Sequence, residues 1–268
     1  MAGPFTLVAF HAHPDDEALL MGGTLARLAA EGHRVVLAVA TDGEAGAAAE
    51  AYRSGGGLAA NRRSELERSA AALGCARLVR FGFKDSGSAG PRIVGGFSTL
   101  AVEEAAEPLI QLLREEQADA LTIYDPAGGY GHPDHRQVHA VGTHAASRAG
   151  TRLVLEATID RRLIRRLIRV VAAIPGVLPD VSVDAYDHAY SPSTAITHRV
   201  DVRRYLRQKR ASFEAHASQA SSDEGARTLA LLLRLPRWLF ASMLGREWYV
   251  EHGRRPGKPL DDVFASLR

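Results

Sequence analysis

Short, continuous apolar runs that alternate with helical patterns constrain the fold of this chain most. Residues 35–40 read Val-Val-Leu-Ala-Val-Ala, and similar runs occupy residues 5–10 and 118–124. A run without polar alternation is typical of a strand buried on both faces, as in a parallel sheet. Between the runs, apolar residues recur at helical spacing, for example over residues 62–73. The pattern predicts an α/β fold: a Rossmann-like, mostly parallel sheet covered by helices.

Overall charge and cysteine content exclude several classes of protein. The 268 residues include 33 basic and 31 acidic side chains. The charges nearly balance, so the net charge does not point to a nucleic-acid partner. The single cysteine, Cys75, excludes an intramolecular disulfide. No secretory signal opens the chain and no apolar run is long enough to span a bilayer, so we expect a cytoplasmic protein without a transmembrane segment.

A cluster of histidine and carboxylate side chains follows the first predicted strand. Residues 11–17 read His-Ala-His-Pro-Asp-Asp-Glu and precede a helical pattern, and Pro14 suits a first helical turn. On such a turn His13 and Asp16, three residues apart, can approach one point. An imidazole and a carboxylate that converge are two ligands of a divalent metal. The alternative is an acidic helix N-terminus, which is common without any metal.

A second cluster of similar composition follows a later predicted strand. Residues 125–135 read Asp-Pro-Ala-Gly-Gly-Tyr-Gly-His-Pro-Asp-His and lead into another helical pattern. In an open α/β sheet, ligands bind in the crevice at the carboxyl ends of the strands. A catalytic zinc typically has three protein ligands, so one histidine of this cluster would complete the set that the first cluster begins. The other histidine and a carboxylate would then be available for proton transfer.

The two clusters together resemble the motifs of the LmbE-like (PIG-L) family of zinc-dependent N-acetylglucosaminyl deacetylases. Residues 12–17 and 132–135 match its two hallmark motifs. Residues 41–44, 62–66 and 83–87 resemble further family segments, and Lys209 and His216 with Ser218 and Gln219 resemble its C-terminal pattern. The resemblance covers about residues 5–220.

The resemblance implies a role for individual residues. It assigns the metal to His13, Asp16 and His135; the ion would be Zn²⁺, with Fe²⁺ or another divalent ion as alternatives. Asp15 would be the general base toward the attacking water, and His132 would stabilise the oxyanion or protonate the leaving amine. Asp134 would orient a histidine, as carboxylates beside metal ligands do. The remaining assignments are Tyr130 as an oxyanion donor, and Arg62, Asp85 and Glu44 as substrate contacts. Glu17 would support the first turn.

The implied reaction is removal of an N-acetyl group from a small N-acetylglucosamine-type conjugate. An amidase that cleaves a larger acyl group from a mycothiol-type conjugate would use the same residues. A non-catalytic sugar-binding protein is the third alternative, but such a protein would be expected to have lost Asp15 or a metal ligand. A dinucleotide-binding protein would need a Gly-x-Gly-x-x-Gly turn after the first strand, and Gly22 and Gly23 come too late for one. Oligomer formation stays open.

The C-terminal part of the sequence is less regular. Residues 1–160 are expected to be the catalytic α/β core that carries both motifs. Residues 161–268 would complete the sheet and the substrate pocket within one continuous domain. Residues 161–171 place leucine and isoleucine on one helical face and arginine on the other, which favours a surface helix over peripheral membrane contact. Residues 174–196 contain three prolines and predict an irregular segment.

Overall fold

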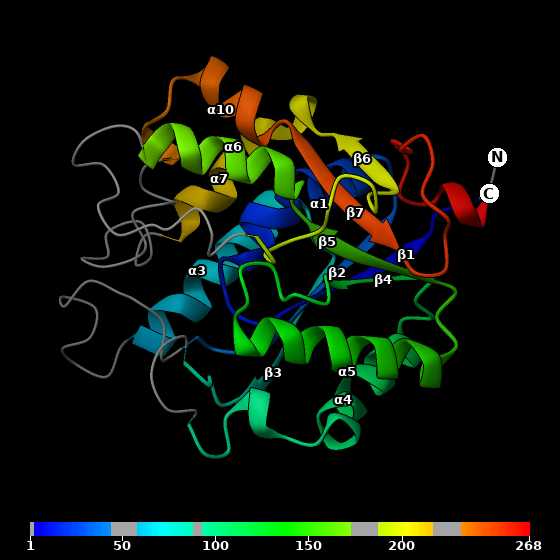
Figure 1. The fold of residues 1–268 in the computed structure, drawn as a ribbon. Coiled ribbons are helices and arrows are strands. Elements are labelled where there is room, and N and C mark those ends of the chain that lie inside the picture. The colour runs from blue at the N-terminus through cyan, green and yellow to red at the C-terminus, as the bar shows by residue number, and fades with distance from the viewer. Residues whose placement is uncertain (1–2, 44–57, 88–92, 173–186, 217–231) are drawn as a thin grey trace.

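Among the residues that the structure describes, seven strands form one sheet in the order β3-β2-β1-β4-β5-β7-β6 (Figure 1). The computed structural model describes residues 3–43, 58–87, 93–172, 187–216 and 232–268. The first five strands are parallel, whereas β7 runs antiparallel to both β5 and β6. The strands are β1 (Thr6–His11), β2 (Arg34–Thr41), β3 (Arg77–Phe83), β4 (Ala120–Tyr124), β5 (Leu153–Thr158), β6 (His198–Asp201) and β7 (Arg246–Glu251).

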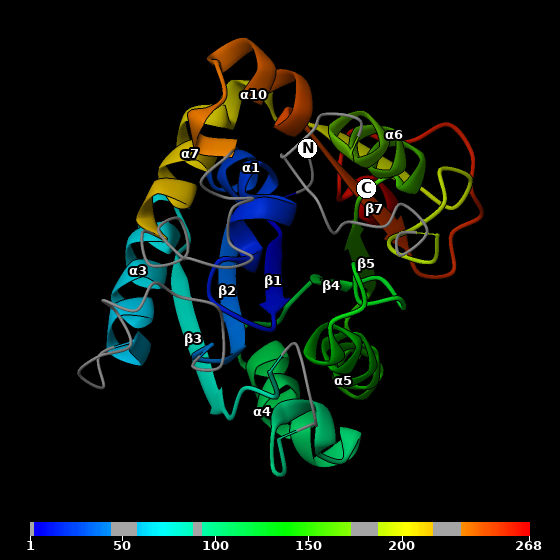
Figure 2. The same cartoon turned by 60° about the vertical axis from the view of Figure 1, so that its left-hand side comes forward.

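Helices cover both faces of the sheet. On one face α1, α3 and α7 pack together, and on the other α4 packs against α5 (Figure 2). Helix α5 approaches β4 closely at Gly142, where a Cβ atom would lie 2.3 Å from Ile123 Cγ2. The helices are α1 (Asp16–Ala30), α3 (Leu58–Leu73), α4 (Val102–Glu115), α5 (Pro133–Ala149), α6 (Arg161–Ala172), α7 (Leu206–Ala215) and α10 (Arg237–Leu244).

The direction of strand succession reverses between β1 and β4. Strands β2 and β3 lie beyond β1, and β5 lies beyond β4. Such a reversal leaves a crevice at the carboxyl ends of the two central strands, where ligands bind in open α/β sheets. The loops that follow β1 and β4 carry the two histidine clusters. The topology therefore brings residues 11–17 together with residues 125–135.

The predicted α/β class is confirmed. Strands β1, β2 and β4 are buried along almost their whole length, as their continuous apolar sequences predict. The sequence did not predict β6 or β7 as strands. In β7 the residues that face inward are Glu247, Tyr249 and Glu251, so buried glutamates obscure the usual apolar alternation. Tyr249 is fully buried in this strand.

Helix α6 lies on the surface, with isoleucine side chains toward the core and arginine side chains toward solvent. Ile168 is buried and Ile164 packs against the main core, whereas Arg162, Arg166 and Arg169 are exposed. This arrangement fits a surface helix with a solvated arginine face. Within the described ranges, the helices are too short or too polar to cross a membrane. A cytoplasmic location stays a prediction.

Candidate metal centre and active site

The loop between β1 and α1 turns sharply at Asp15. This residue has φ 109°, a value uncommon for any residue except glycine, although aspartate adopts it more readily than most. The Asp15 N–H donates a hydrogen bond to Glu17 Oε2 at 3.0 Å, which holds the turn. Pro14 was predicted to lie in the first helical turn. The helix begins instead at Asp16, because the backbone reverses at Asp15.

Asp16 lies between two histidines. Its Oδ2 atom is 3.2 Å from His13 Nδ1, and its Oδ1 atom is 3.3 Å from His135 Nε2. Burial alone would raise the pKa of Asp16, but the adjacent His135 and His13 hold it well below its usual range. The predicted convergence of His13 and Asp16 is therefore present. A carboxylate that stays ionised between two imidazoles is a suitable environment for a divalent cation.

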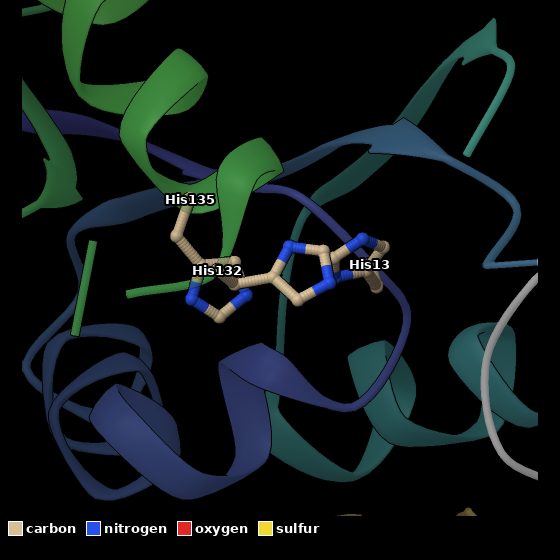
Figure 3. A group of neighbouring side chains, drawn as sticks. All are labelled: His13, His132 and His135. Atoms are coloured by element: carbon tan, nitrogen blue, oxygen red, sulfur yellow. The ribbon is translucent and has the colours of Figure 1, made fainter. Parts of the chain in front are cut away.

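Three imidazoles lie side by side at this edge of the sheet (Figure 3). His13 comes from the loop after β1, whereas His132 and His135 come from the start of α5. One nitrogen from each ring lies within 4.8 Å of the others. The ring centroids of His13 and His132 are 4.7 Å apart, and those of His132 and His135 are 4.9 Å apart. His132 therefore lies close enough to His13 and His135 to belong to one group that could hold a metal ion.

His135 provides the test of whether these residues fit a metal. Its side chain is buried, and its Nε2 atom lies 3.3 Å from Asp16 Oδ1, but neither ring nitrogen forms a well-aligned hydrogen bond with the described residues. Buried polar atoms nearly always form hydrogen bonds, so a buried imidazole that forms none beside a carboxylate fits a site for a metal ion. The ring is stacked on Tyr124, with centroids 4.2 Å apart and planes 5° apart. Tyr124 thus holds the ring in the orientation that places Nε2 beside Asp16, and the donor set fits a divalent metal.

Asp134 orients His13. Its Oδ2 atom is 3.2 Å from His13 Nε2 and accepts the N–H of Ser86, while Oδ1 accepts the N–H of Ser98. Although burial opposes ionisation, the hydrogen bonds from His13 and Ser86 lower the pKa of Asp134 to about 2. An ionised acceptor at Nε2 requires a proton there, so Nδ1 is the nitrogen left to take a metal. The histidine oriented by Asp134 is therefore His13.

Asp15 has the electrostatic environment of a proton acceptor. Burial raises the pKa of Asp15 to about 6, although the nearby Arg62 guanidinium acts in the opposite direction. Arg62 Nη2 lies 3.5 Å from Asp15 Oδ2 and donates to the carbonyl oxygen of Pro14 at 2.7 Å. A carboxyl group with a pKa near the working pH both accepts and returns a proton readily. Arg62 also holds the loop that positions this carboxylate.

Two further side chains can donate a hydrogen bond at the site. His132 Nδ1 accepts the backbone N–H of Asp134 at 3.1 Å, so a neutral ring carries its proton on Nε2. Burial and the neighbouring His13 and His135 lower the pKa of His132 to about 4, which keeps the ring neutral at pH 7. Tyr130 lies against the rings of His132 and His135 and is half exposed. Partial burial and the nearby carboxylates raise the pKa of Tyr130, so its hydroxyl group stays protonated.

The predicted substrate contacts are only partly brought together. Asp85 is buried, with Oδ1 3.7 Å from His13 Nε2, and Arg62 is buried beside Asp15. The Nε atom of Arg62 has no hydrogen-bond partner within the described ranges. Glu44 falls outside the described residues, as do Ser218 and Gln219.

The contacts of Tyr124 and the partners of Glu17 were not predicted from the sequence. Tyr124, the last residue of β4, donates or accepts at His11 Nδ1 (3.2 Å) and accepts the N–H of Ala12. Beneath the Asp15 turn, Glu17 accepts hydrogen bonds from His216 Nε2 at 2.6 Å and from the Ser69 hydroxyl at 2.5 Å. Glu17 thus supports the turn, as predicted. Tyr124 could have been found by its place at the carboxyl end of a central strand, but the partners of Glu17 are too distant in sequence.

The fold and the site together define a class of protein. Hydrolysis by an activated water needs metal ligands with an adjacent group that can take a proton. The carboxyl ends of β1 and β4 bring together residues that could hold a metal and, beside them, the Asp15 carboxylate, which is the combination that a metal-dependent hydrolase needs.

Comparison with known proteins narrows this class to a family. Residues 8–146, just over half of the chain, match the GlcNAc-PI de-N-acetylase (PIG-L) family. A 1D-myo-inositol 2-acetamido-2-deoxy-alpha-D-glucopyranoside deacetylase from Nocardiopsis dassonvillei is 36% identical, with 96% of this chain and 99% of that protein covered. The chain belongs to the PIG-L family, and the predicted membership of a family of deacetylases is confirmed.

Solved structures show how widely the fold is used. The N,N'-diacetylchitobiose deacetylase from Pyrococcus horikoshii superimposes with a TM-score of 0.61 at 22% identity, covering 92% of this chain and 83% of that one. GalB, the 4-carboxy-2-hydroxymuconate hydratase from Pseudomonas putida KT2440, gives 0.60 at 16% identity, covering 96% and 99%. Because a deacetylase and a hydratase share this architecture, the fold alone does not define the reaction.

Proposed function

We propose that the protein is a metal-dependent hydrolase that removes the N-acetyl group from an N-acetylglucosamine-type glycoconjugate. The observation that supports this most directly is the buried imidazole of His135, which forms no hydrogen bond within the described ranges and lies beside the ionised Asp16. Asp15, with a pKa raised to about 6, is next to Asp16 in the chain. These groups match what amide hydrolysis requires at neutral pH.

The proposed ligands of the metal are His13, Asp16 and His135. Zinc is the proposed ion because two imidazoles and a carboxylate, with one position left open, are a typical catalytic zinc set. Such an ion, when bound, lowers the pKa of a water molecule and polarises the amide carbonyl. At His13 the ion would replace a proton: burial lowers the pKa, but the hydrogen bonds to Asp134 and Asp16 outweigh it and raise the pKa of His13 to about 10.

Different side chains transfer the proton and stabilise the oxyanion. Asp15 accepts the proton of the attacking water, and as a carboxylic acid it can pass this proton to the leaving amine. His132 keeps its proton on Nε2 and donates a hydrogen bond to the developing oxyanion, which fits an imidazole that is neutral at pH 7. Tyr130 is proposed as a second donor from the rim. Asp134 holds the His13 ring in place.

The proposed substrate class is a glucosamine N-acetylated at C2 and linked to a polyol. The support is the Nocardiopsis dassonvillei relative, whose name gives an inositol-linked 2-acetamido sugar as its substrate and which matches over almost its full length. Arg62, Asp85 and Glu44 are proposed to contact sugar hydroxyls. Among the described residues, no contact favours the amidase alternative, which would need a deeper acyl pocket. All proposed ligands and Asp15 are present, which disfavours a non-catalytic sugar-binding protein.

The test is release of acetate from 1D-myo-inositol 2-acetamido-2-deoxy-alpha-D-glucopyranoside, with metal content measured on the same samples. We expect a chelator to abolish turnover and added Zn²⁺ to restore it. His135→Ala should lose both metal and turnover, whereas His132→Ala should keep the metal and lose turnover. Unchanged metal content in His135→Ala would refute the ligand assignment. A fully metal-loaded protein that releases no acetate from this substrate or from other N-acetylglucosamine conjugates would refute the proposed function.

A further inference from the structure

A second group of potential metal ligands lies outside the crevice, where α5 packs over the sheet. His139 belongs to α5, Glu156 belongs to β5, and His252 directly follows β7. One ligand atom from each of the three side chains lies within 4.8 Å of the others. His139 is four residues, about one helical turn, after the proposed ligand His135. We propose that His139, Glu156 and His252 form a second divalent-metal site, with zinc as the best-suited ion.

The Glu156 carboxylate is the centre of the group. Its Oε1 atom lies 2.5 Å from His252 Nε2 and 3.6 Å from His139 Nδ1, and the two imidazole centroids are 5.9 Å apart. Zinc bonds of about 2.0–2.2 Å place tetrahedral ligand atoms about 3.3 Å from one another. A metal ion therefore needs the short contact between Glu156 and His252 to open by less than about 1 Å. The partly exposed His252 side chain would make this movement.

His139 is already held as metal-ligating histidines usually are. Its Nδ1 atom lies 3.1 Å from the carbonyl oxygen of Tyr124, and a carbonyl oxygen can only accept, so Nδ1 carries the proton. The neutral ring then has its lone pair on Nε2, so this nitrogen would be the ligand, rather than the Nδ1 atom that lies 3.6 Å from Glu156. Metal-ligating histidines almost always donate their other N–H to a carbonyl or carboxylate oxygen, which fixes the tautomer and the ring orientation. The backbone of β4 supplies this contact for His139.

Access and ligand chemistry favour zinc over a hard cation. The His139 and His252 side chains are 23% and 32% exposed, so an ion can enter from solvent, whereas Glu156 is 8% exposed. Two imidazoles and one carboxylate are a known zinc donor set, while calcium and magnesium prefer oxygen ligands. Water would fill the remaining position. The site would then join α5, which carries His132 and His135 at its start, to β5 and to the end of β7.

The decisive measurement is the number of zinc ions per chain after equilibrium dialysis of metal-stripped protein against buffered free Zn²⁺. We expect two ions for the wild type, one for His13→Ala, one for His252→Ala, and none for the double variant. The exposed His188 provides the matched control, and His188→Gln should keep two. Each variant tests one site on its own: His13→Ala tests the proposed catalytic ion, and His252→Ala tests the second ion.

A second readout guards against loss of zinc through misfolding. In the His13→Ala background, Zn²⁺ should still raise the midpoint of thermal unfolding, because an ion that binds only the folded chain stabilises it. Glu156→Gln or His252→Ala added to that background should remove the shift while leaving the midpoint in chelator nearly unchanged. One zinc ion in the wild type with none in His13→Ala would overturn the proposal. Two ions in His252→Ala would overturn it as well.

Discussion

At the scale of the residue, Asp15 and Asp16 show how adjacent, chemically identical side chains acquire different properties. Burial raises the pKa of Asp15 to about 6, whereas His135 and His13 hold the pKa of Asp16 well below its usual range. The sharp turn at Asp15 separates the two side chains, so that only Asp16 lies between the imidazoles. Groups whose surroundings move their pKa values apart are suited to different roles in acid–base chemistry.

The separation predicts the behaviour of Asp15→Asn. Asparagine tolerates positive φ and keeps the shape of the side chain, so the turn and the metal ligands should persist. The variant cannot accept a proton, and we expect turnover to fall about 10²–10⁴-fold. Acetate release and metal content should be measured together, with His188→Gln as a surface control. Turnover equal to that of the wild type would remove Asp15 from the mechanism.

At the scale of the element, a buried ion pair connects α1, α7 and β7. Lys209 Nζ lies 2.5 Å from Glu247 Oε1, and both side chains are almost completely buried. Glu247 also accepts the backbone N–H groups of Gly23 and Thr24 in α1, and Lys209 donates to the carbonyl oxygen of Leu19. This pair holds the helix that begins at Asp16 against the C-terminal strand. Lys209 was matched to a family pattern from the sequence alone, and these contacts give the residue a structural role.

Removal of one partner of this pair should be costly. Lys209→Met leaves the Glu247 carboxylate buried without its counterion, and we expect the free energy of unfolding to fall by about 3–5 kcal/mol. Lys258 is exposed, so Lys258→Met should change stability by less than about 0.5 kcal/mol. Urea denaturation of the three proteins measures both values. A loss below about 1 kcal/mol for Lys209→Met would show that the pair contributes little.

At the scale of the whole molecule, the C-terminal part completes the sheet. Strand β7 pairs with β5 on one side and β6 on the other, and Glu247 and His216 reach back to α1. The division at residue 160 therefore cuts through one sheet and one set of buried polar contacts. A chain cut there would expose the edge of β5, leaving unpaired backbone groups and buried charges without partners.

This connectivity predicts that residues 1–160 do not fold alone. The isolated segment should show no cooperative thermal transition, whereas the full chain should unfold in a single one. Circular dichroism and calorimetry of both proteins provide the comparison. A cooperative transition in the 1–160 segment would instead support a separate catalytic domain.

An element was predicted correctly from the sequence where its signal was local, and missed where it depended on distant residues. The central strands were predictable because burial on both faces requires continuous apolar runs, as in residues 35–40. Strand β7 was not, because its inward positions include Glu247 and Glu251, whose partners come from distant elements. The start of α1 was misplaced by two residues, since propensity does not predict that Asp15 adopts positive φ.

The sequence alone determined the α/β class and the two motifs, because hydrophobic periodicity and short chemical motifs are local properties. Only the tertiary structure decided the surroundings of each motif residue, and with them its protonation and its contacts. The reversal of strand order placed the loops after β1 and β4 side by side, and burial then set the pKa of Asp15 and left His135 without a hydrogen bond to the described residues. The group of His139, Glu156 and His252 likewise exists only in three dimensions, because its members are up to 113 residues apart. Long-range packing brings such groups together, and no local pattern encodes it.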